Sequence, residues 1–296
     1  MSKPFYITTT LPYVNADPHI GFAMELVQAD IFARYNRLIG NEVFLNTGTD
    51  EHGLKVYRKA IEENRDPQKY TDEYAARFKK LVSELGLVDD INFIRTTDPE
   101  HKKVAQEFWR RCDANGYIYK KNYKIKYCVG CELEKTESEL EDEHCPIHPN
   151  LDIEILEEEN YFFKFSEFKD KLLALYKSNP NFIVPENRFN EMKAFVERGP
   201  EDFSISRLAS KMPWGIPVPG DDTQVFYVWF DALINYISAI GWPNDMERFS
   251  KWWPVVQFAG KDQNRQQSAM WQAMLMAAGI ELPKQVVVHG WWTSEG

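Results

Sequence analysis

A strand, a helix and a second strand follow one another at the start of the chain. Residues 3–13, KPFYITTTLPY, are rich in β-branched and aromatic residues, which is typical of a strand. After Asp17 and Pro18, apolar residues recur at helical spacing, and Gly40 provides a stop for that helix. The recurring residues are Ile20, Met24, Val27, Ile31, Tyr35 and Leu38. A second strand-like run, EVFLNTG, begins at residue 42, so this segment predicts a β-α-β unit of a parallel sheet.

The alternation of strands and helices continues, stops and then returns. Helices are predicted at 54–64, 71–85 and 99–115, and another helical region at 166–199 lies after the change in character. The turn-rich run PWGIPVPGDD at 213–222 marks a boundary. Beyond it, strands are predicted at 224–230, 254–260 and 284–290, with helices at 231–240 and 262–278. We therefore expect an α/β domain in two halves, 1–116 and 223–296, split by an insertion at 117–222.

Composition excludes several classes of protein. With 44% apolar and 14% aromatic residues the chain can bury a large core, unlike a disordered segment. A net charge of −10 argues against binding nucleic acid through bulk positive charge. No apolar run reaches the roughly 20 residues of a membrane span, and the N-terminus lacks a secretory apolar stretch. Four cysteines, three of them clustered, favour a reducing cytoplasmic compartment over a disulfide framework.

The clustered cysteines have the spacing of a metal site. Cys128 and Cys131 are separated by two residues, and so are Cys145 and His148. Two such pairs can close a tetrahedron around zinc, and four protein ligands predict a structural site. His144 is a rival ligand that the spacing favours less. The plainer interpretation is a loop with buried or free thiols. It is less favoured, because a segment this hydrophilic has little core in which thiols could be buried. Cys112 stands alone on a helical pattern and is predicted to be a core residue.

The start of the first helix has the chemistry of a phosphate site. A helix N-terminus offers free N–H groups and the positive end of a dipole. Gly21 lets a base or ribose approach the backbone, and His19 can donate a hydrogen bond to phosphate oxygens. A histidine at such a position is more often a cap or a core residue. Its place after the first parallel strand favours the binding role, because ligands bind at that edge of such sheets.

Two more polar loops are predicted to meet at the same sheet edge. TGTDEHG, residues 47–53, ends the second strand and carries Asp50 and His52. AGKD, residues 259–262, joins a later strand to a helix start. Three polar loops converging on one edge predict a nucleotide site.

The motifs resemble those of a known family. PHIGF resembles the HIGH motif of class I aminoacyl-tRNA synthetases, with Phe22 in place of the second histidine. Further segments occur in the order expected of the methionyl-tRNA synthetases, whose connective insertion carries zinc knuckles at this place. These segments are LPYVNADPHIG, TGTDEHG, DFSISR, WGIPVPG, VWFDALINYIS, AGKD and HGWWT. The resemblance covers essentially the whole chain, and TGTDEHG with VWFDALINY is specific to the methionine enzymes within the class.

The resemblance implies a fold and a reaction. The fold would be a Rossmann-like parallel sheet split by a zinc-bearing connective insertion. The reaction would be that of a methionine–tRNA ligase. Methionine and ATP, with Mg²⁺, give methionyl adenylate and pyrophosphate, and the methionyl group then passes to the terminal adenosine of a methionine-specific tRNA. No membrane partner is implied.

The resemblance also implies roles for individual residues. His19 would be catalytic and assist attack of the methionine carboxylate on the α-phosphate, and Asp50 would hold the amino group. The residues on the ATP side would be Asn15, His19, Gly21, Gly260, Asp262 and His289. The side-chain pocket of methionine would be walled by Leu11, Tyr13, Trp229, Ala232 and Tyr236, with Gln267 beside the sulfur. Leu233 shares a helix face with Trp229, and we interpret it as core.

The chain departs from the family pattern in three places. Phe22 removes one phosphate donor of the HIGH motif, which shifts work to His19 and backbone N–H groups. Gln266 and Gln267 stand where the family has an aromatic–histidine pair, and an amide cannot act on a thioether as an imidazole does. The lysine-rich KMSKS loop has no match, and the helical anticodon-binding domain is absent. The chain therefore resembles a fragment of a longer enzyme, with much of the tRNA-binding surface expected downstream of Gly296.

Two other functions compete with this interpretation. The first is a small-molecule nucleotidyltransferase with a similar helix start, against which the cysteine pairs and VWFDALINY speak. The second is a non-catalytic, synthetase-like module that binds tRNA or a protein through its zinc insertion. Retention of His19, Asp50, Trp229 and Tyr236 disfavours it.

Overall fold

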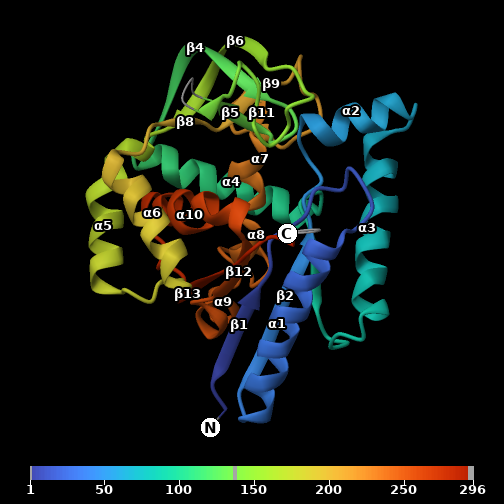
Figure 1. Ribbon diagram of the computed structural model, residues 1–296, viewed down its shortest axis with the longest axis vertical. Helices are drawn as coiled ribbons and strands as arrows, with labels where there is room; N and C mark the ends of the chain where they lie inside the picture. The colour runs from blue at the N-terminus through green and yellow to red at the C-terminus, as the bar shows by residue number, and fades with distance from the viewer. Residues whose placement is uncertain (1, 136–138, 293–296) are drawn as a thin grey trace.

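A six-stranded parallel sheet forms the centre of the molecule. The computed structural model describes residues 2–135 and 139–292. The strands run in the order β3-β2-β1-β12-β13-β7, and every neighbouring pair is parallel (Figure 1). They are β1 (Pro4–Thr8), β2 (Glu42–Thr49), β3 (Asn92–Arg95), β7 (Ile183–Val184), β12 (Val256–Gly260) and β13 (Gln285–His289). The predicted α/β class with a Rossmann-like parallel sheet is confirmed.

The strand order reverses at one place in this sheet. From β1 the chain moves outward through β2 to β3, and it later returns to pair β12 with the free side of β1. The loops that follow β1 and β12 therefore leave the sheet in opposite directions and open a crevice between them. This switch point lies at the carboxyl ends of the strands, where the predicted polar loops converge.

The helices of the first half form close to their predicted positions. They are α1 (Ile20–Leu38), α2 (Leu54–Glu62), α3 (Pro67–Glu84) and α4 (Pro99–Ala114). α3 begins earlier than predicted because Asp66 caps it, accepting a hydrogen bond from the Lys69 N–H at 3.1 Å, and Pro67 suits the first turn. The apolar spacing thus predicted that these helices exist, and the Asp66 cap, which the prediction did not include, sets the start of α3.

The buried face of α1 is not the one that the apolar spacing suggested. Ile20, Ile31, Tyr35 and Leu38 are exposed, and Leu38 keeps 85% of its surface accessible. The buried residues of α1 are Phe22, Leu26, Ala29 and Ala33 together with Glu25, Asp30 and Asn36. Ala29 and Ala33 pack against the sheet residues Ile7 and Leu45, where α1 lies close to the strands, and Phe22 and Leu26 belong to a second cluster with Phe78.

The middle of the chain forms two antiparallel sheets above the parallel one (Figure 1). The order β5-β4-β6-β8 makes one sheet and β10-β11-β9 the other. Their strands are β4 (Ile118–Cys128), β5 (Leu133–Lys135), β6 (Glu154–Phe163), β8 (Phe203–Ser204), β9 (Ser206–Leu208), β10 (Pro217–Val218) and β11 (Asp221–Phe226). β7 lies within the predicted insertion but pairs with β13 in the main sheet. The division of the chain into two halves and an insertion stays a prediction.

The helical region predicted at 166–199 is divided by β7. A 3-10 turn η2 (Phe165–Phe168) leads into α5 (Lys169–Ser178), and α6 (Glu186–Arg198) follows the strand. Asn179 and Pro180 end the first helix, and Pro185 begins the second.

The strand predicted at 224–230 is partly wrong. β11 ends at Phe226, and the following VWF belongs to helix α7 (Val228–Ala232), which α8 (Asn235–Ser238) follows after a break. The apolar run suits a buried helix as well as a buried strand, and periodicity does not separate the two. α9 (Met246–Trp252) was not predicted. The helix predicted at 262–278 consists of a 3-10 turn η3 (Lys261–Gln263), a π-helical turn η4 (Gln266–Met270) and α10 (Trp271–Ala278).

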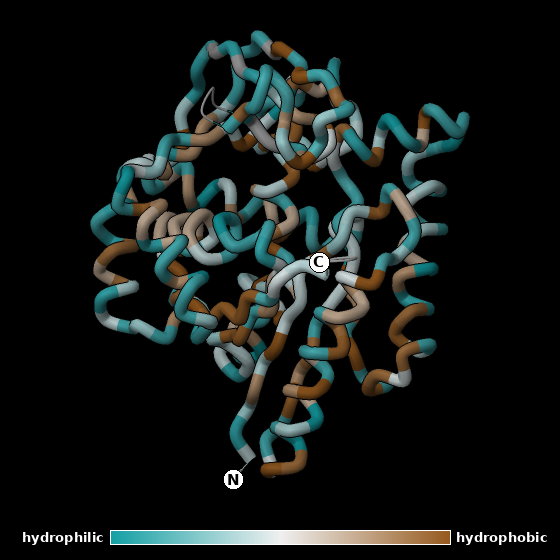
Figure 2. The backbone as a smooth tube through the Cα atoms, viewed as in Figure 1, coloured by the Kyte–Doolittle hydropathy of each residue, from teal (hydrophilic) through white to brown (hydrophobic). Residues whose placement is uncertain are grey.

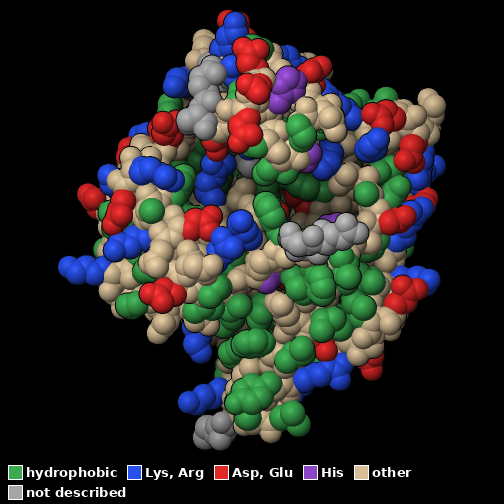
Figure 3. Space-filling model, viewed as in Figure 1, with side chains coloured by type: hydrophobic (Ala, Val, Ile, Leu, Met, Phe, Trp, Pro, Cys, Tyr) green, Lys and Arg blue, Asp and Glu red, His purple; other side chains and the backbone are tan. Residues whose placement is uncertain are grey.

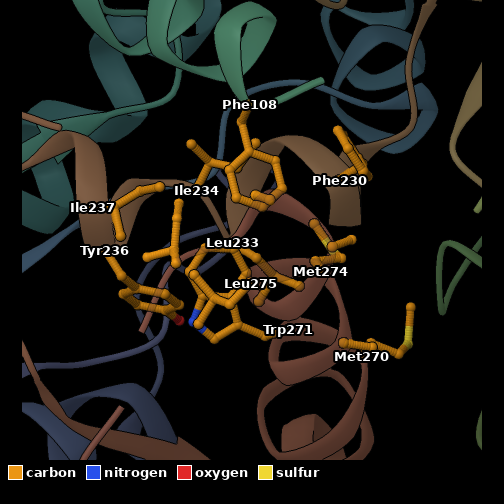
Figure 4. Close-up of a cluster of buried hydrophobic side chains, with 14 of the residues drawn as sticks. Phe108, Phe230, Leu233, Ile234, Tyr236, Ile237, Met270, Trp271, Met274 and Leu275 are labelled. Atoms are coloured by element: carbon orange, nitrogen blue, oxygen red, sulfur yellow. The ribbon is translucent and has the colours of Figure 1, made fainter. Parts of the chain in front are cut away.

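The main core lies between the sheet and the helices α4, α7, α8 and α10. Phe108 stacks on Trp271 with ring centroids 5.7 Å apart and meets Phe230 edge-on (Figure 4). Leu233 and Cys112 are buried in the same cluster, as predicted. Most hydrophobic segments lie in the parallel-sheet part of the molecule, while the chain above it is more hydrophilic (Figure 2). Among the described residues, no helix combines the length and apolarity needed to cross a bilayer.

Candidate functional site

A cavity of about 650 Å³ opens at the carboxyl edge of the parallel sheet. In the space-filling view the surface is hollowed beneath the upper part of the molecule, near the end of the described chain (Figure 3). The cavity is lined by nine of the predicted ligand-binding residues: Leu11, Tyr13, Asn15, His19, Gly21, Trp229, Gly260, Asp262 and His289. All six predicted ATP-side residues are among them. The HGWWT segment also lines the cavity as far as Trp292, while Thr293 lies outside the described residues.

His19 caps the N-terminus of α1. His19 has an extended backbone, and its Nδ1 accepts a hydrogen bond from the Phe22 backbone N–H, with 3.4 Å between the two nitrogens. A neutral ring that accepts at Nδ1 carries its proton on Nε2, so that nitrogen remains a donor for a ligand. The interpretations of His19 as a cap and as a phosphate donor are therefore compatible, because one ring nitrogen serves each.

Phe22 packs inward although it replaces a polar residue of the motif. Its side chain is 6% exposed, and its ring meets Phe78 edge-on at 5.4 Å. The hydrophobic contact between α1 and α3 explains how an apolar residue is accommodated at this place.

His289 supplies a second polar group on the ATP side. Its Nδ1 lies 2.8 Å from the carbonyl oxygen of Gly290, and its Nε2 lies 2.8 Å from a carboxylate oxygen of Glu25. Partial burial opposes charging, but the hydrogen bonds to Glu25 and Gly290 outweigh it and raise the pKa of His289. With an acceptor at each nitrogen, the surroundings favour the charged form of the ring at the edge of the cavity.

Asp50 is a buried carboxylate beside Tyr13. The two residues form an isolated parallel bridge, with the Asp50 N–H donating to the Pro12 carbonyl at 2.9 Å. Asp50 is 2% exposed, and its Oδ1 has no hydrogen-bond partner among the described residues. Burial, and then the charge of nearby carboxylates, raises the pKa of Asp50 well above its usual range. A cationic donor bound here would relieve both penalties.

The remaining predicted pocket residues lie behind the cavity wall. Ala232 and Tyr236 are buried on α7 and α8, and Gln267 is buried on the π-helical turn η4. None of these three lines the open cavity, whereas Trp229 and Tyr13 do, with ring centroids 6.2 Å apart. The open cavity therefore reaches the aromatic pair but not these three buried residues.

The two glutamines that depart from the family pattern have different surroundings. Gln267 donates from Nε2 to the Tyr236 hydroxyl at 2.5 Å, so its nearest polar partner is the tyrosine. Gln266 lines the cavity, and its Oε1 has no partner among the described residues. The Gln267 Nε2 is thus engaged by Tyr236, while its buried Oε1 has no partner among the described residues.

The four predicted metal ligands come together. One ligand atom from each of Cys128, Cys131, Cys145 and His148 lies within 4.8 Å of the others. His148 Nδ1 is 3.2 Å from the Cys131 sulfur and 3.8 Å from the Cys128 sulfur. His144 is exposed and interacts with the Asp142 carbonyl instead, so it is not part of the cluster.

The knuckles also form part of the cavity wall. Gly130, Cys131 and His148 line it opposite His19. A Cβ on Gly130 would lie 2.6 Å from the His148 ring, so only glycine permits this approach. Lys55 at the start of α2 donates to the Gly130 carbonyl at 3.2 Å, which joins the knuckle to the parallel-sheet part of the molecule.

Three residues at the site were not predicted from the sequence. Glu25 accepts from the Thr10 N–H and hydroxyl at 2.6 and 2.7 Å and pairs with His289. Glu132 follows a metal ligand, is buried, and accepts from the Lys55 N–H at 2.5 Å. Asp231 is buried between two histidines. Each is a charged residue within an otherwise apolar or loop segment, and its partners are distant in sequence.

Comparison with known proteins identifies the family. Residues 5–149 and 130–296 match the family described as tRNA synthetases class I (M). The chain is 48% identical to the methionine–tRNA ligase of Thermotoga maritima, over 99% of this chain and 47% of that protein. It belongs to the methionyl-type class I tRNA synthetases. The corresponding ligase of Rickettsia bellii is 46% identical over 100% of this chain and 58% of the relative. The synthetase chain thus spans about half the length of these curated relatives.

Solved structures of this synthetase family superpose closely. The Mycobacterium tuberculosis methionyl-tRNA synthetase in complex with methionyl-adenylate has a TM-score of 0.93 and 41% identity, covering 97% of this chain and 57% of that one. The apo form of the same synthetase gives a TM-score of 0.83 at 38% identity, covering 98% and 56%. The fold described above is therefore nearer to the adenylate-bound synthetase than to the free one.

Proposed function

We propose that the chain carries the site for activating methionine with ATP, as a methionine–tRNA ligase. A methionine carboxylate oxygen attacks the α-phosphorus, the bond to the bridging oxygen breaks, and pyrophosphate leaves with Mg²⁺. The supporting observation is the buried Asp50, whose Oδ1 has no hydrogen-bond partner among the described residues and whose bridge partner Tyr13 lines the cavity at the switch point of the sheet. Such a carboxylate suits the ammonium group of an amino acid, and the cavity suits a nucleotide.

The ATP-side residues would stabilise charge that develops at phosphorus. His19 Nε2–H and the free N–H groups of α1 face the place where an anion would bind. His289, whose charged form Glu25 favours, would supply positive charge that Phe22 does not. Asn15, Gly21, Gly260 and Asp262 complete this side, with glycines where the nucleotide would approach the backbone.

The methionine side would be formed by aromatic and small residues. Asp50 would bind the amino group, and Leu11, Tyr13 and Trp229 would contact the ligand from the open cavity. Ala232, Tyr236 and Gln267 would be reached when the side chain enters behind Trp229. The Tyr236 hydroxyl accepts from Gln267, so its own hydrogen remains for a weak acceptor such as a thioether sulfur.

A zinc ion fits the Cys3His cluster. Three thiolates and one imidazole nitrogen complete a tetrahedral set, which leaves no position for water and indicates a structural role. When bound, zinc would cross-link the two knuckles that wall the cavity. A cytoplasmic location is part of the proposal, because these thiols hold a metal only while reduced. Transfer of the methionyl group to tRNA, the second family step, is likewise proposed.

Methionine-dependent ATP–pyrophosphate exchange tests the activity. We expect exchange with methionine and far less with leucine or isoleucine, and we expect Asp50→Asn to abolish it. Asp30→Asn is the matched control, because Asp30 is also a buried aspartate but pairs with Arg34 away from the cavity. Binding of tRNA or a protein without any exchange would instead support the non-catalytic module.

A further inference from the structure

A buried network of polar side chains lies behind the cavity and has no part in the proposed chemistry. It consists of Asp231, His52, His101 and Ser238, called here the Asp231 network. His52 Nδ1 is 2.6 Å from one carboxylate oxygen of Asp231, and His101 Nε2 is 2.8 Å from the other. His101 Nδ1 then lies 2.9 Å from the Ser238 hydroxyl. Asp231 and both histidines are at most 2% exposed, so solvent does not substitute for these bonds.

The network has a regular relation to the predicted methionine pocket. His52 is two residues after Asp50, Asp231 is two residues after Trp229, and Ser238 is two residues after Tyr236. These three pocket residues come from the loop after β2, from α7 and from α8. Each of the three segments thus presents one residue to the pocket and a nearby one to the network.

The fourth member connects the network to a rigid element. His101 is in the first turn of α4, whose Phe108 and Trp109 lie in the main core. No residue of α4 is a predicted ligand contact. The helix therefore serves as a fixed reference against which the three pocket segments are held.

The carboxylate is suited to join two rings at once. Each of its oxygens faces one imidazole nitrogen, so each ring donates one N–H. Burial opposes ionisation, but the two histidines outweigh it and lower the pKa of Asp231 to about 2. An ionised carboxylate accepts from both rings, whereas an asparagine would offer one acceptor and one donor.

We propose that Asp231 is a positioning residue that fixes the spacing of Asp50, Trp229 and Tyr236 around methionine. The inference rests on the proposed function and adds a specificity role to residues that do not touch the ligand. If the network were loosened, the Asp50 carboxylate, which would bind the amino group, could move away from the aromatic side chains of Trp229 and Tyr236. Methionine affinity should then fall while ATP affinity stays unchanged, because His19, Asp262 and His289 share no bond with the network.

Calorimetric titration of methionine into the whole chain gives the first test. We expect Asp231→Asn to weaken methionine binding on the order of 10-fold, the lower end of what supporting hydrogen-bond partners contribute at metal centres. The matched control Asp30→Asn also alters a buried aspartate, which accepts from Arg34 Nε at 2.6 Å and the Val88 N–H at 2.9 Å. It should lower stability without changing methionine affinity. Equal affinity of Asp231→Asn and wild type would overturn the inference alone, whereas a wild-type chain that binds no methionine would overturn the proposed function as well.

Variants at His52 give a second test that general destabilisation would not satisfy. His52→Leu removes the donor to Asp231, and His52→Asn keeps an N–H at the place of Nδ1. Because His52 acts through Asp50, His52→Leu should weaken methionine binding but not binding of 4-methylthiobutanoate, which lacks the amino group. His52→Asn should restore most of the methionine affinity. Equal losses for both ligands, or no rescue by asparagine, would show that the network is merely structural, and this test stands even if Asp231→Asn does not fold.

Discussion

The sheet edge and the metal-ligand knuckles face each other across one cavity, yet they are held in place differently. On the sheet side, Ile7 and Phe258 are almost completely buried, and their strands β1 and β12 are each paired on both sides. On the knuckle side, Ile147, Leu151 and Ile155 are exposed, while Cys128 and Cys145 are buried. The sheet edge is stabilised by apolar burial and hydrogen bonds. The knuckles depend on their ligand cluster and on a few bonds to α2, so perturbing the two walls should have separable effects.

The largest expected effect breaks the knuckle wall alone. Cys145→Ser removes one of four ligands, and zinc binding in small zinc domains is worth roughly 10–16 kcal/mol of folding free energy. We expect loss of stoichiometric zinc and faster amide exchange in residues 128–155, with β1 and β12 still protected. Metal analysis and hydrogen-exchange mass spectrometry measure both. Cys112→Ser is the control, because that buried thiol lies in the main core. Unchanged zinc content in Cys145→Ser would refute the site.

The next effect concerns the sheet wall and leaves the knuckles intact. His19→Ala removes a donor to charge that develops during the reaction, which typically costs on the order of 10²–10³ in rate. Methionine affinity should hardly change, because ground-state binding does not need that donor. Pyrophosphate exchange and methionine titration separate the two quantities. His144→Ala, an exposed histidine outside the ligand cluster, should alter neither. Full exchange activity in His19→Ala would remove it from the mechanism.

A smaller change in the knuckle sharpens the comparison. Gly130→Ala places a Cβ 2.6 Å from the His148 ring, and the contact is with a ligand that cannot move away without leaving the cluster. Overpacking of this kind typically costs about 1–3 kcal/mol. We expect weaker zinc retention against a chelator, with the fold of the parallel sheet unchanged. Retention equal to wild type would mean that His148 is free to shift.

The two walls also differ in how well the sequence predicts them. Hydrophobic alternation predicted the parallel sheet and most helices, and ligand spacing predicted the Cys128–His148 cluster. Helical spacing found α1 but suggested the wrong buried face, because Ile31 and Leu38 are exposed while Ala29 and Ala33 pack on the strands. Periodicity reports that a helix exists, and the distance to its neighbour decides which face is buried.

Contacts between distant segments escaped prediction for a related reason. The six ATP-side residues were implied by the family resemblance and all line the cavity, whereas Glu25 and Asp231 acquire meaning only through partners 264 and 179 positions away. β7 was missed because two residues carry too little pattern to distinguish a strand from a turn. The sequence was thus a better guide to the residues in loops that follow strands than to the buried charged residues whose hydrogen bonds fix those loops.

The smallest expected effect is a pH dependence on the sheet wall. The pKa of His289 is raised in the folded chain above its unfolded value of about 6.5, because Glu25 stabilises the charged ring. Below that pH the ring is charged in both states, so its contribution to stability is fully present. As pH rises through the folded pKa, the ring loses its proton and the contribution disappears. The unfolding free energy of wild type relative to His289→Gln should therefore decline above pH 6.5, by on the order of 1 kcal/mol, because a shift of one pKa unit corresponds to about 1.4 kcal/mol. Urea denaturation across this range measures it, and the same comparison in a Glu25→Gln background should show no decline. A difference that grows with pH would contradict the charged state assigned to His289.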